Sequence, residues 1–198
     1  MKPTKFKTHY LYLLPFTFYL LTSPAKALPG ESKQTVAAWI EGHPTLRPGI
    51  GDGLRVTKSD TPAMRFTFQA TALPPGRIAV PRNSSGIRSE RISFYDAING
   101  VTTERLVESL RVIYGPPIYQ DYERARIVYA YPTPETVDVA RRQNRPLLAA
   151  QQGELRVGER YAYWMEIIQT DSGNALNGQL TVFLKEDIDK LETELRDR

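Results

Sequence analysis

The sequence has 198 residues, no cysteine, 26 Lys and Arg residues and 22 Asp and Glu residues. The lack of cysteine excludes disulfides, thiolate chemistry and a cysteine-linked lipid anchor. Four of the basic residues lie in residues 1–27, which contain no acid, so residues 28–198 are formally neutral. Their net charge therefore gives no reason to expect nucleic acid or another polyanion as a partner.

Residues 1–27 are predicted to be a cleavable secretory signal peptide. Three lysines among the first seven residues precede an uncharged apolar run over residues 10–21, and Ala25-Lys26-Ala27 provides a small-residue cleavage site. The apolar run is shorter than the roughly 20 residues that a membrane-spanning helix needs. We therefore expect an exported protein, located in a periplasm, a lumen or the extracellular space. Its mature chain, residues 28–198, is expected to be a single globular domain without a stable membrane anchor.

The first half of the mature chain predicts one helix followed by short strands. Gly42 and Pro44 are helix-ending residues after an apolar stripe. Apolar and polar residues alternate strictly over 64–70, as in a half-buried strand. Ser59-Asp60-Thr61-Pro62 is typical of a turn and predicts a hairpin. The predicted elements are, in chain order, a helix at 31–41 and strands at 54–56, 64–70, 78–80 and 91–95.

The second half predicts more helices and an antiparallel meander. Thr102 or Thr103 is a helix cap, Gly115-Pro116-Pro117 is a stop, and Thr133-Pro134-Glu135 is a helix start. Helices mixed with runs of short strands predict an α+β fold, with an antiparallel sheet of about six to eight strands and three or four helices. The predicted elements are a helix at 103–113, a strand at 126–131, a helix from 134, strands at 154–157, 161–169 and 179–185, and a C-terminal helix carrying Ile188, Leu191 and Leu195.

Four features resemble catalytic or ligand-binding motifs, but a structural role is favoured for each. His43 is the only histidine of the mature chain, which excludes a two-histidine zinc site within one chain. Asp171-Ser172-Gly173 resembles an aspartic protease turn, which a homodimer would have to complete because no second copy occurs. The glycine-rich segment 49–53 lacks the preceding strand and following helix of a phosphate loop. Glu166 lies in an apolar strand, where we expect a carboxylate at the core edge, paired with an arginine. No metal and no cofactor are predicted.

The dense tyrosines are the most informative feature. Tyr129 and Tyr131 are two residues apart, as are Tyr161 and Tyr163, so each pair shares one face of its strand. If the two strands are neighbours, their rings form a platform suited to sugars, peptides or a partner protein. The alternative is a core or cross-strand ladder, where tyrosine is common. The predicted binding residues are Tyr119, Tyr122, Tyr129, Tyr131, Tyr161, Tyr163 and Arg126.

One stretch resembles sequences of a known group. Residues 98–102 (Ile-Asn-Gly-Val-Thr), 104–106 (Glu-Arg-Leu), Tyr114-Gly115 and 118–122 (Ile-Tyr-Gln-Asp-Tyr) are similar to small exported proteins of photosynthetic bacteria. That group has no established activity. The resemblance implies a bacterial exported protein and transfers no catalytic residue.

The missing catalytic motifs and the tyrosines predict an exported, non-enzymatic binding or assembly module. Its partner is expected to be a protein or an envelope component. An alternative is an envelope-directed hydrolase with paired carboxylates, for which Glu166 and Asp171 are the first candidates. A third hypothesis is a carrier of an apolar ligand inside the sheet.

Overall fold

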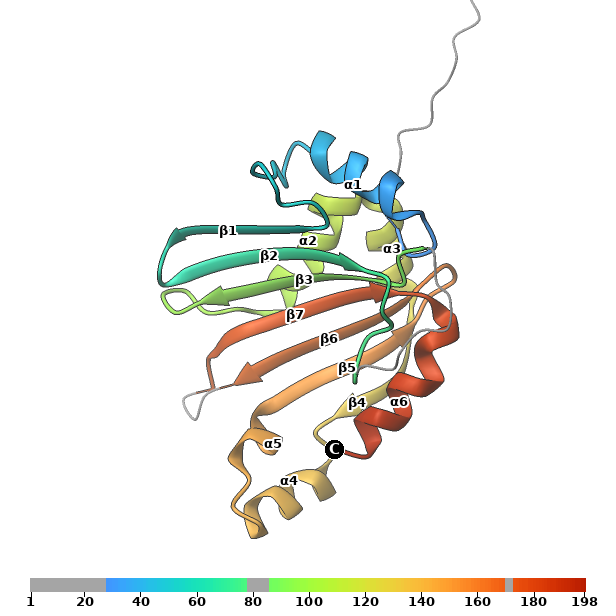
Figure 1. The fold of residues 1–198 in the computed structure, drawn as a ribbon. Helices are drawn as coiled ribbons and strands as arrows, with labels where there is room; N and C mark the ends of the chain where they lie inside the picture. The colour runs from blue at the N-terminus through green and yellow to red at the C-terminus, as the bar shows by residue number, and fades with distance from the viewer. Residues whose placement is uncertain (1–27, 78–85, 170–172) are drawn as a thin grey trace, which may run out of the picture.

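One antiparallel sheet of seven strands organises the computed structural model, which describes residues 28–77, 86–169 and 173–198 (Figure 1). The strand order is β1-β2-β3-β7-β6-β5-β4, so two sequential meanders meet where β3 pairs with β7. The strands are β1 (Arg55–Thr61), β2 (Met64–Thr71), β3 (Ser89–Asp96), β4 (Arg126–Tyr131), β5 (Gln151–Val157), β6 (Ala162–Gln169) and β7 (Ala175–Phe183).

Six α-helices accompany the sheet in the described part of the chain, so the predicted α+β class and strand number are confirmed and the helices are more numerous than predicted. Helix α6 follows directly on a 3₁₀ turn at Lys185–Asp187. The helices are α1 (Lys33–Gly42), α2 (Thr103–Tyr114), α3 (Pro116–Arg124), α4 (Pro134–Arg142), α5 (Pro146–Ala150) and α6 (Ile188–Arg196).

Side-chain caps fix where three of these helices begin. The side-chain oxygens of Ser32, Thr102 and Thr133 each accept a hydrogen bond from the backbone N–H three residues later. Each bond satisfies one of the donors that a helix leaves unpaired in its first turn. The sequence signals for the last two caps were therefore read correctly.

The structure contains two helices that begin with proline and that the sequence did not predict. Gly115 ends α2 as expected, but Pro116 and Pro117 then form the first turn of α3, a helix that was not predicted. Pro146 likewise begins the unpredicted α5. Proline suits a first helical turn because its missing N–H would be unpaired there anyway. The predicted signal peptide and the predicted strand at 78–80 lie outside the described residues.

The turn between the first two strands is also shorter than predicted. The predicted hairpin is confirmed, because β1 and β2 pair antiparallel, but the predicted turn at 59–62 is too long: β1 continues to Thr61, which pairs with Met64. Only Pro62 and Ala63 form the connection. The polar end of β1 lies at an exposed edge of the sheet, and its pairing with β2 is irregular between Lys58 and Thr61.

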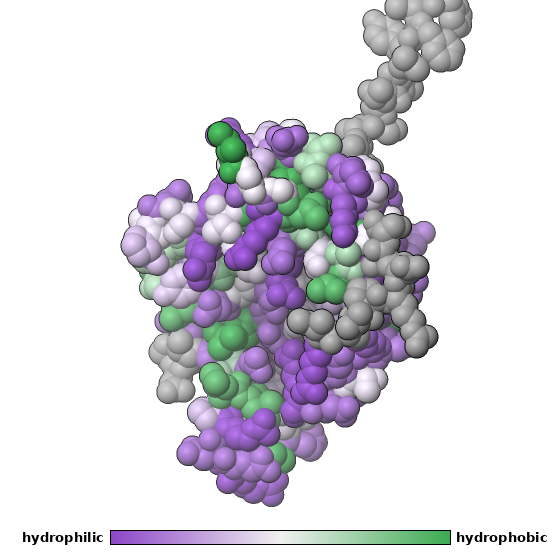
Figure 2. Space-filling model, in the orientation of Figure 1, coloured by the Kyte–Doolittle hydropathy of each residue, from purple (hydrophilic) through white to green (hydrophobic). Residues whose placement is uncertain are grey.

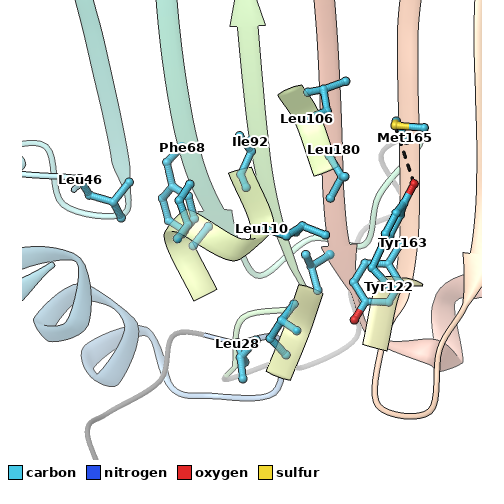
Figure 3. Close-up of a cluster of buried hydrophobic side chains, with 14 of the residues drawn as sticks. Leu28, Leu46, Phe68, Ile92, Leu106, Leu110, Tyr122, Tyr163, Met165 and Leu180 are labelled. Carbon is cyan, nitrogen blue, oxygen red and sulfur yellow. Dashed lines mark hydrogen bonds between the residues drawn. The ribbon is translucent and has the colours of Figure 1, made fainter. Parts of the chain in front are cut away.

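Helices α1, α2 and α3 cover one face of the sheet and enclose the main core (Figures 1 and 3). Phe68, Ile92 and Leu180 stand opposite one another on β2, β3 and β7 because their registers align. Leu106 and Leu110 of α2 are completely buried against this face. Full burial stabilises each such side chain by about 1.5–3 kcal/mol, which makes this interface the main source of stability.

Helix α6 covers part of the opposite face. Leu191 and Leu195 pack with Leu155, Trp164 and Phe183 in a second, smaller apolar cluster over the strands β5, β6 and β7. The outward residues of β2 are polar and reach the solvent or half-buried positions. The sheet therefore has one fully covered face and one face that is covered only beside α6.

The carboxylate of Asp121 ties α3 to the turn between β5 and β6. It accepts hydrogen bonds from the backbone N–H groups of Glu159, Arg160 and Tyr161 at 2.9, 3.2 and 3.3 Å. It also accepts the hydroxyl of Tyr163 at 2.6 Å. This anion is held by a nest of donors and fixes α3 against the end of the sheet.

A second acid, Glu90, is buried completely in the main core. It lies on β3 between Ala70 and Val182 of the neighbouring strands. The hydroxyl of Tyr114 donates to its Oε2 at 2.8 Å, and Oε1 has no partner among the described residues. Burial raises the pKa of Glu90 to about 8, although the bond from Tyr114 lowers it.

Replacing Glu90 with Gln is expected to stabilise the protein, relative to wild type, increasingly as the pH rises. The unfolded chain ionises this carboxyl near its ordinary pKa of 4.5, but the folded protein keeps it protonated until about pH 8. Between pH 4.5 and about pH 8 the folded state holds one more proton than the unfolded state. The free energy of unfolding of the wild type therefore falls by about 1.4 kcal/mol per pH unit in this window and stops falling above about pH 8. Urea unfolding across this range measures the slope.

The matched control is Glu159→Gln, which changes an exposed carboxylate. It should leave the wild-type slope in place. A difference between wild type and Glu90→Gln that does not vary with pH would contradict the raised pKa.

Candidate functional site

The predicted binding tyrosines do not form one platform. Strand β5 lies between β4, which carries Tyr129 and Tyr131, and β6, which carries Tyr163. Tyr163 faces the main core, whereas Tyr129 and Tyr131 pack in the smaller cluster under α6. Tyr161 precedes β6 and is half-buried against the main core. The two pairs therefore lie on opposite faces of the sheet.

Tyr119 and Tyr122 line a hollow of about 550 Å³ between α2, α3 and the strands β5 and β6. The hydroxyl of Tyr122 donates to Glu154 at 2.7 Å, and its ring packs edge-on against Tyr163. Burial and the neighbouring Glu154 raise the pKa of Tyr122, so its hydroxyl stays a donor. We call this the acidic hollow. Its charged lining residues are Glu104, Glu108, Glu123, Glu154 and Arg156.

Tyr129 and Tyr131 are held under the end of α6 by arginines. Their rings stack with centroids 5.8 Å apart. The guanidinium of Arg196 lies 4.4 Å from the ring of Tyr129, and that of Arg198 lies 5.8 Å from the ring of Tyr131. Cation–π contacts of this kind attach the end of the helix to β4. Arg126, the other predicted binding residue of β4, is exposed at the beginning of that strand.

Glu166 is the centre of a hydrogen-bond network on the same face. Its Oε2 accepts the hydroxyl of Tyr131 and a guanidinium N–H of Arg198, both at 2.7 Å. Its Oε1 accepts the amide of Gln179 at 3.3 Å, and Tyr131 in turn accepts Nε1 of Trp164 at 2.7 Å. The predicted pairing of Glu166 with an arginine is thus confirmed. We call these five residues the Glu166 network.

Two buried polar atoms lie beside this network without a hydrogen-bond partner in the described part of the chain. Arg91 on β3 and Thr181 on β7 are direct cross-strand neighbours. Nε of Arg91 and Oγ1 of Thr181 are buried without a hydrogen bond from any described residue. Burial lowers the pKa of Arg91, and the nearby Glu166 carboxylate offsets part of this effect. Buried polar atoms are nearly always paired in native proteins, so this region holds unused hydrogen-bonding capacity.

A cleft of about 640 Å³ adjoins the network where α5 approaches the end of α6. Arg198 links the two, since it pairs with Glu166 and also lines the cleft. None of the ion pairs among the described residues involves Arg77 or Arg145. We call this the arginine cleft. Its lining consists of Arg77, Arg145, Arg198, Asp197, Gln151, Pro146, Leu147 and Leu148.

A smaller hollow on the same face lies on the other side of Glu166. It has a volume of about 210 Å³, and Ser93, Glu166, Ile168 and Gln179 contribute to its lining. The carboxylate of Glu166 therefore lines this smaller hollow, and its ion-pair partner Arg198 lines the arginine cleft.

The other motifs of the sequence have structural roles. His43 accepts the backbone N–H groups of Thr45 and Leu46 on Nδ1, which leaves Nε2–H to donate to the carbonyl of Ile113 at 3.0 Å. Asp52 closes the glycine-rich loop by accepting the N–H of Gly49. Asp171 lies outside the described residues. Within the described ranges, no group of His, Asp and Glu side chains is placed to bind a metal ion.

Comparisons with protein-family models, with curated proteins and with solved structures found no match to this chain. The sequence predicted the pairing of Glu166 with an arginine, but it did not predict the arginine cleft. The cleft is formed by residues from distant positions, and only the proximity of α5 and α6 brings them together.

Replacing Tyr131 with Phe should destabilise the protein by about 1–3 kcal/mol, because it leaves buried groups of Glu166 and Trp164 without their partner. Chemical denaturation followed by tryptophan fluorescence measures this loss.

The matched control is Tyr129→Phe, whose hydroxyl makes no hydrogen bond with the described residues. That change should stay within about 0.5 kcal/mol of wild type. Equal losses in both variants would show that ring packing, and not the hydroxyl network, holds this region.

Proposed function

We propose that this chain is an exported, non-enzymatic binding module that holds an anionic group, attached to an apolar body, in the arginine cleft. The observation that carries the proposal is the lining of the cleft. Three arginines and one aspartate stand beside Pro146, Leu147 and Leu148. The volume of about 640 Å³ lies within the range of small-ligand sites.

The chemistry of the arginines supports an anion as the ligand. A guanidinium group presents a planar fork of donors that matches a carboxylate or a phosphate. Arg198 is already engaged with Glu166. Neither Arg77 nor Arg145 forms an ion pair with another described residue, although the carboxylate of Glu194 interacts electrostatically with Arg77 and Asp197 shares the lining.

The apolar lining supports an amphiphile over a small inorganic anion. Leu147 is 71% exposed at the rim of the cleft and lies beside Pro146 and Leu148 in its lining. A ligand that places its charge at the arginines and its apolar part at the leucines would use both halves of the lining. An envelope component of this chemistry agrees with the predicted export.

Nothing in the described geometry favours the two alternative functions. A hydrolase with Glu166 and Asp171 needs a free carboxylate pair. Glu166 is 8% exposed and already accepts three hydrogen bonds. An internal carrier needs a cavity in the core, where the large side chains between sheet and helices pack closely (Figure 3). Both remain predictions from the sequence alone.

Binding of dodecanoate or dodecyl phosphate to the purified protein tests the proposal by calorimetry below the micelle concentration. Both should bind, and dodecyl maltoside, with the same chain and no charge, should bind far more weakly. Arg145→Gln should lower the affinity for both anions about tenfold or more, since a hydrogen bond to a charged group contributes about 1.5–3 kcal/mol.

The matched control is Arg55→Gln, which removes an exposed arginine from β1 at the far edge of the sheet. It should leave the affinity unchanged. Equal affinity for the neutral chain, or equal loss in both variants, would refute recognition in the arginine cleft.

A further inference from the structure

The distal end of the α4–α5 hairpin combines positive charge with exposed apolar surface. Residues 141–148 read Arg-Arg-Gln-Asn-Arg-Pro-Leu-Leu and contain three arginines and no acid. The first seven of these residues are all exposed, including Leu147. We call this segment the hairpin tip. Its acidic neighbours, Glu135 and Asp138, lie earlier in α4.

The hairpin projects from one end of the sheet. In Figure 1 α4 and α5 form the lobe at the bottom of the view, beyond the ends of β4 and β5. Figure 2 shows this lobe as mainly hydrophilic, with a hydrophobic patch where it approaches the sheet. The helices pack on each other, and only α5 makes its main contacts with the sheet, at β5 and β6. The tip is therefore presented away from the body.

The tip is held in a defined shape by backbone hydrogen bonds. The N–H of Arg145 donates to the carbonyl of Ala140 at 2.8 Å, and that of Gln143 to Val139 at 2.9 Å. Asn144 adopts a left-handed conformation with φ of 52°, as is common at helix ends. Pro146 then begins α5, on which Leu147 is an exposed side chain at the rim of the arginine cleft. The hydrogen bonds therefore give the backbone that carries the three arginines and Leu147 a defined conformation.

We infer that the hairpin tip is a docking surface for an anionic lipid bilayer. Arginines close to an anionic surface are attracted to its headgroups, and an exposed leucine is stabilised when it inserts among them. With only three arginines and one leucine, we expect weak and reversible attachment. The inference rests on the proposed function in one respect: the ligand of the arginine cleft is taken from this bilayer.

Two further observations favour a bilayer over an acidic protein as the occupant. The tip has eight residues, whereas a standard protein interface uses roughly 20–30 residues on each side. A bilayer needs no shape complementarity, only charge and an apolar side chain at the headgroup level. Moreover, Arg145, Pro146 and Leu147 belong both to the tip and to the lining of the cleft. A lipid headgroup at the tip is thus next to the cleft.

Sedimentation with vesicles tests this inference. The protein should bind vesicles of phosphatidylglycerol and phosphatidylcholine but not vesicles of phosphatidylcholine alone, and added salt should weaken the binding. The double variant Arg141→Gln/Arg142→Gln leaves the cleft lining intact and should bind the anionic vesicles at least tenfold more weakly. The control Arg55→Gln/Arg65→Gln removes the same charge from β1 and β2 and should bind like wild type.

The outcomes separate the two proposals. Equal binding to both vesicle types, or equal loss in the two double variants, overturns docking at the tip. If the wild-type protein binds dodecyl phosphate but no vesicles, docking fails and the proposed function stands. If Arg141→Gln/Arg142→Gln loses vesicle binding and dodecyl phosphate never binds, docking is supported and the cleft proposal fails.

Discussion

The burial of β6 on both faces is the constraint on which the site depends. Tyr163, Met165 and Ile167 face the main core, so the alternate residues Trp164 and Glu166 face α6. A carboxylate in that position is stable only if donors surround it. The donors come from β4, β7 and the end of α6, so satisfying one acid fixes three elements together. Because Arg198 is one of these donors, its pairing with Glu166 also fixes its position in the lining of the arginine cleft.

Formal neutrality of residues 28–198 conceals an uneven distribution of charge. The acidic hollow lies on the face covered by α2 and α3, whereas the arginine cleft lies on the face of α6. Total charge governs long-range attraction, but local recognition depends on charges that share a surface. Composition alone could not reveal this separation, because the contributing residues come from distant parts of the chain.

The sequence predicted the fold class and most elements, because local signals determine them. Strict alternation over 64–70 marked β2, and threonine caps marked α2 and α4. Proline signals were ambiguous, because a proline after a helix can follow its end or form the first turn of a new helix, as Pro116 does in α3 after Gly115 has ended α2. The tyrosine platform failed for a different reason. Alternation shows which side chains share a face of one strand, but it does not show which strands are neighbours, and β5 separates β4 from β6.

The pairing of β3 with β7 has a consequence for how the chain is made. During synthesis β2 precedes β3, so one edge of β3 can pair at once. Its other edge pairs with β7, as Ser89 does with Phe183, and β7 is made much later. Until β7 arrives, the waiting edge exposes unpaired backbone donors and acceptors, which are a template for pairing with other chains. Closing so long a loop is also slow compared with forming local hairpins. A chain interrupted before Ala175 would therefore keep an open, aggregation-prone edge, and the addition of β7 is the event that protects it.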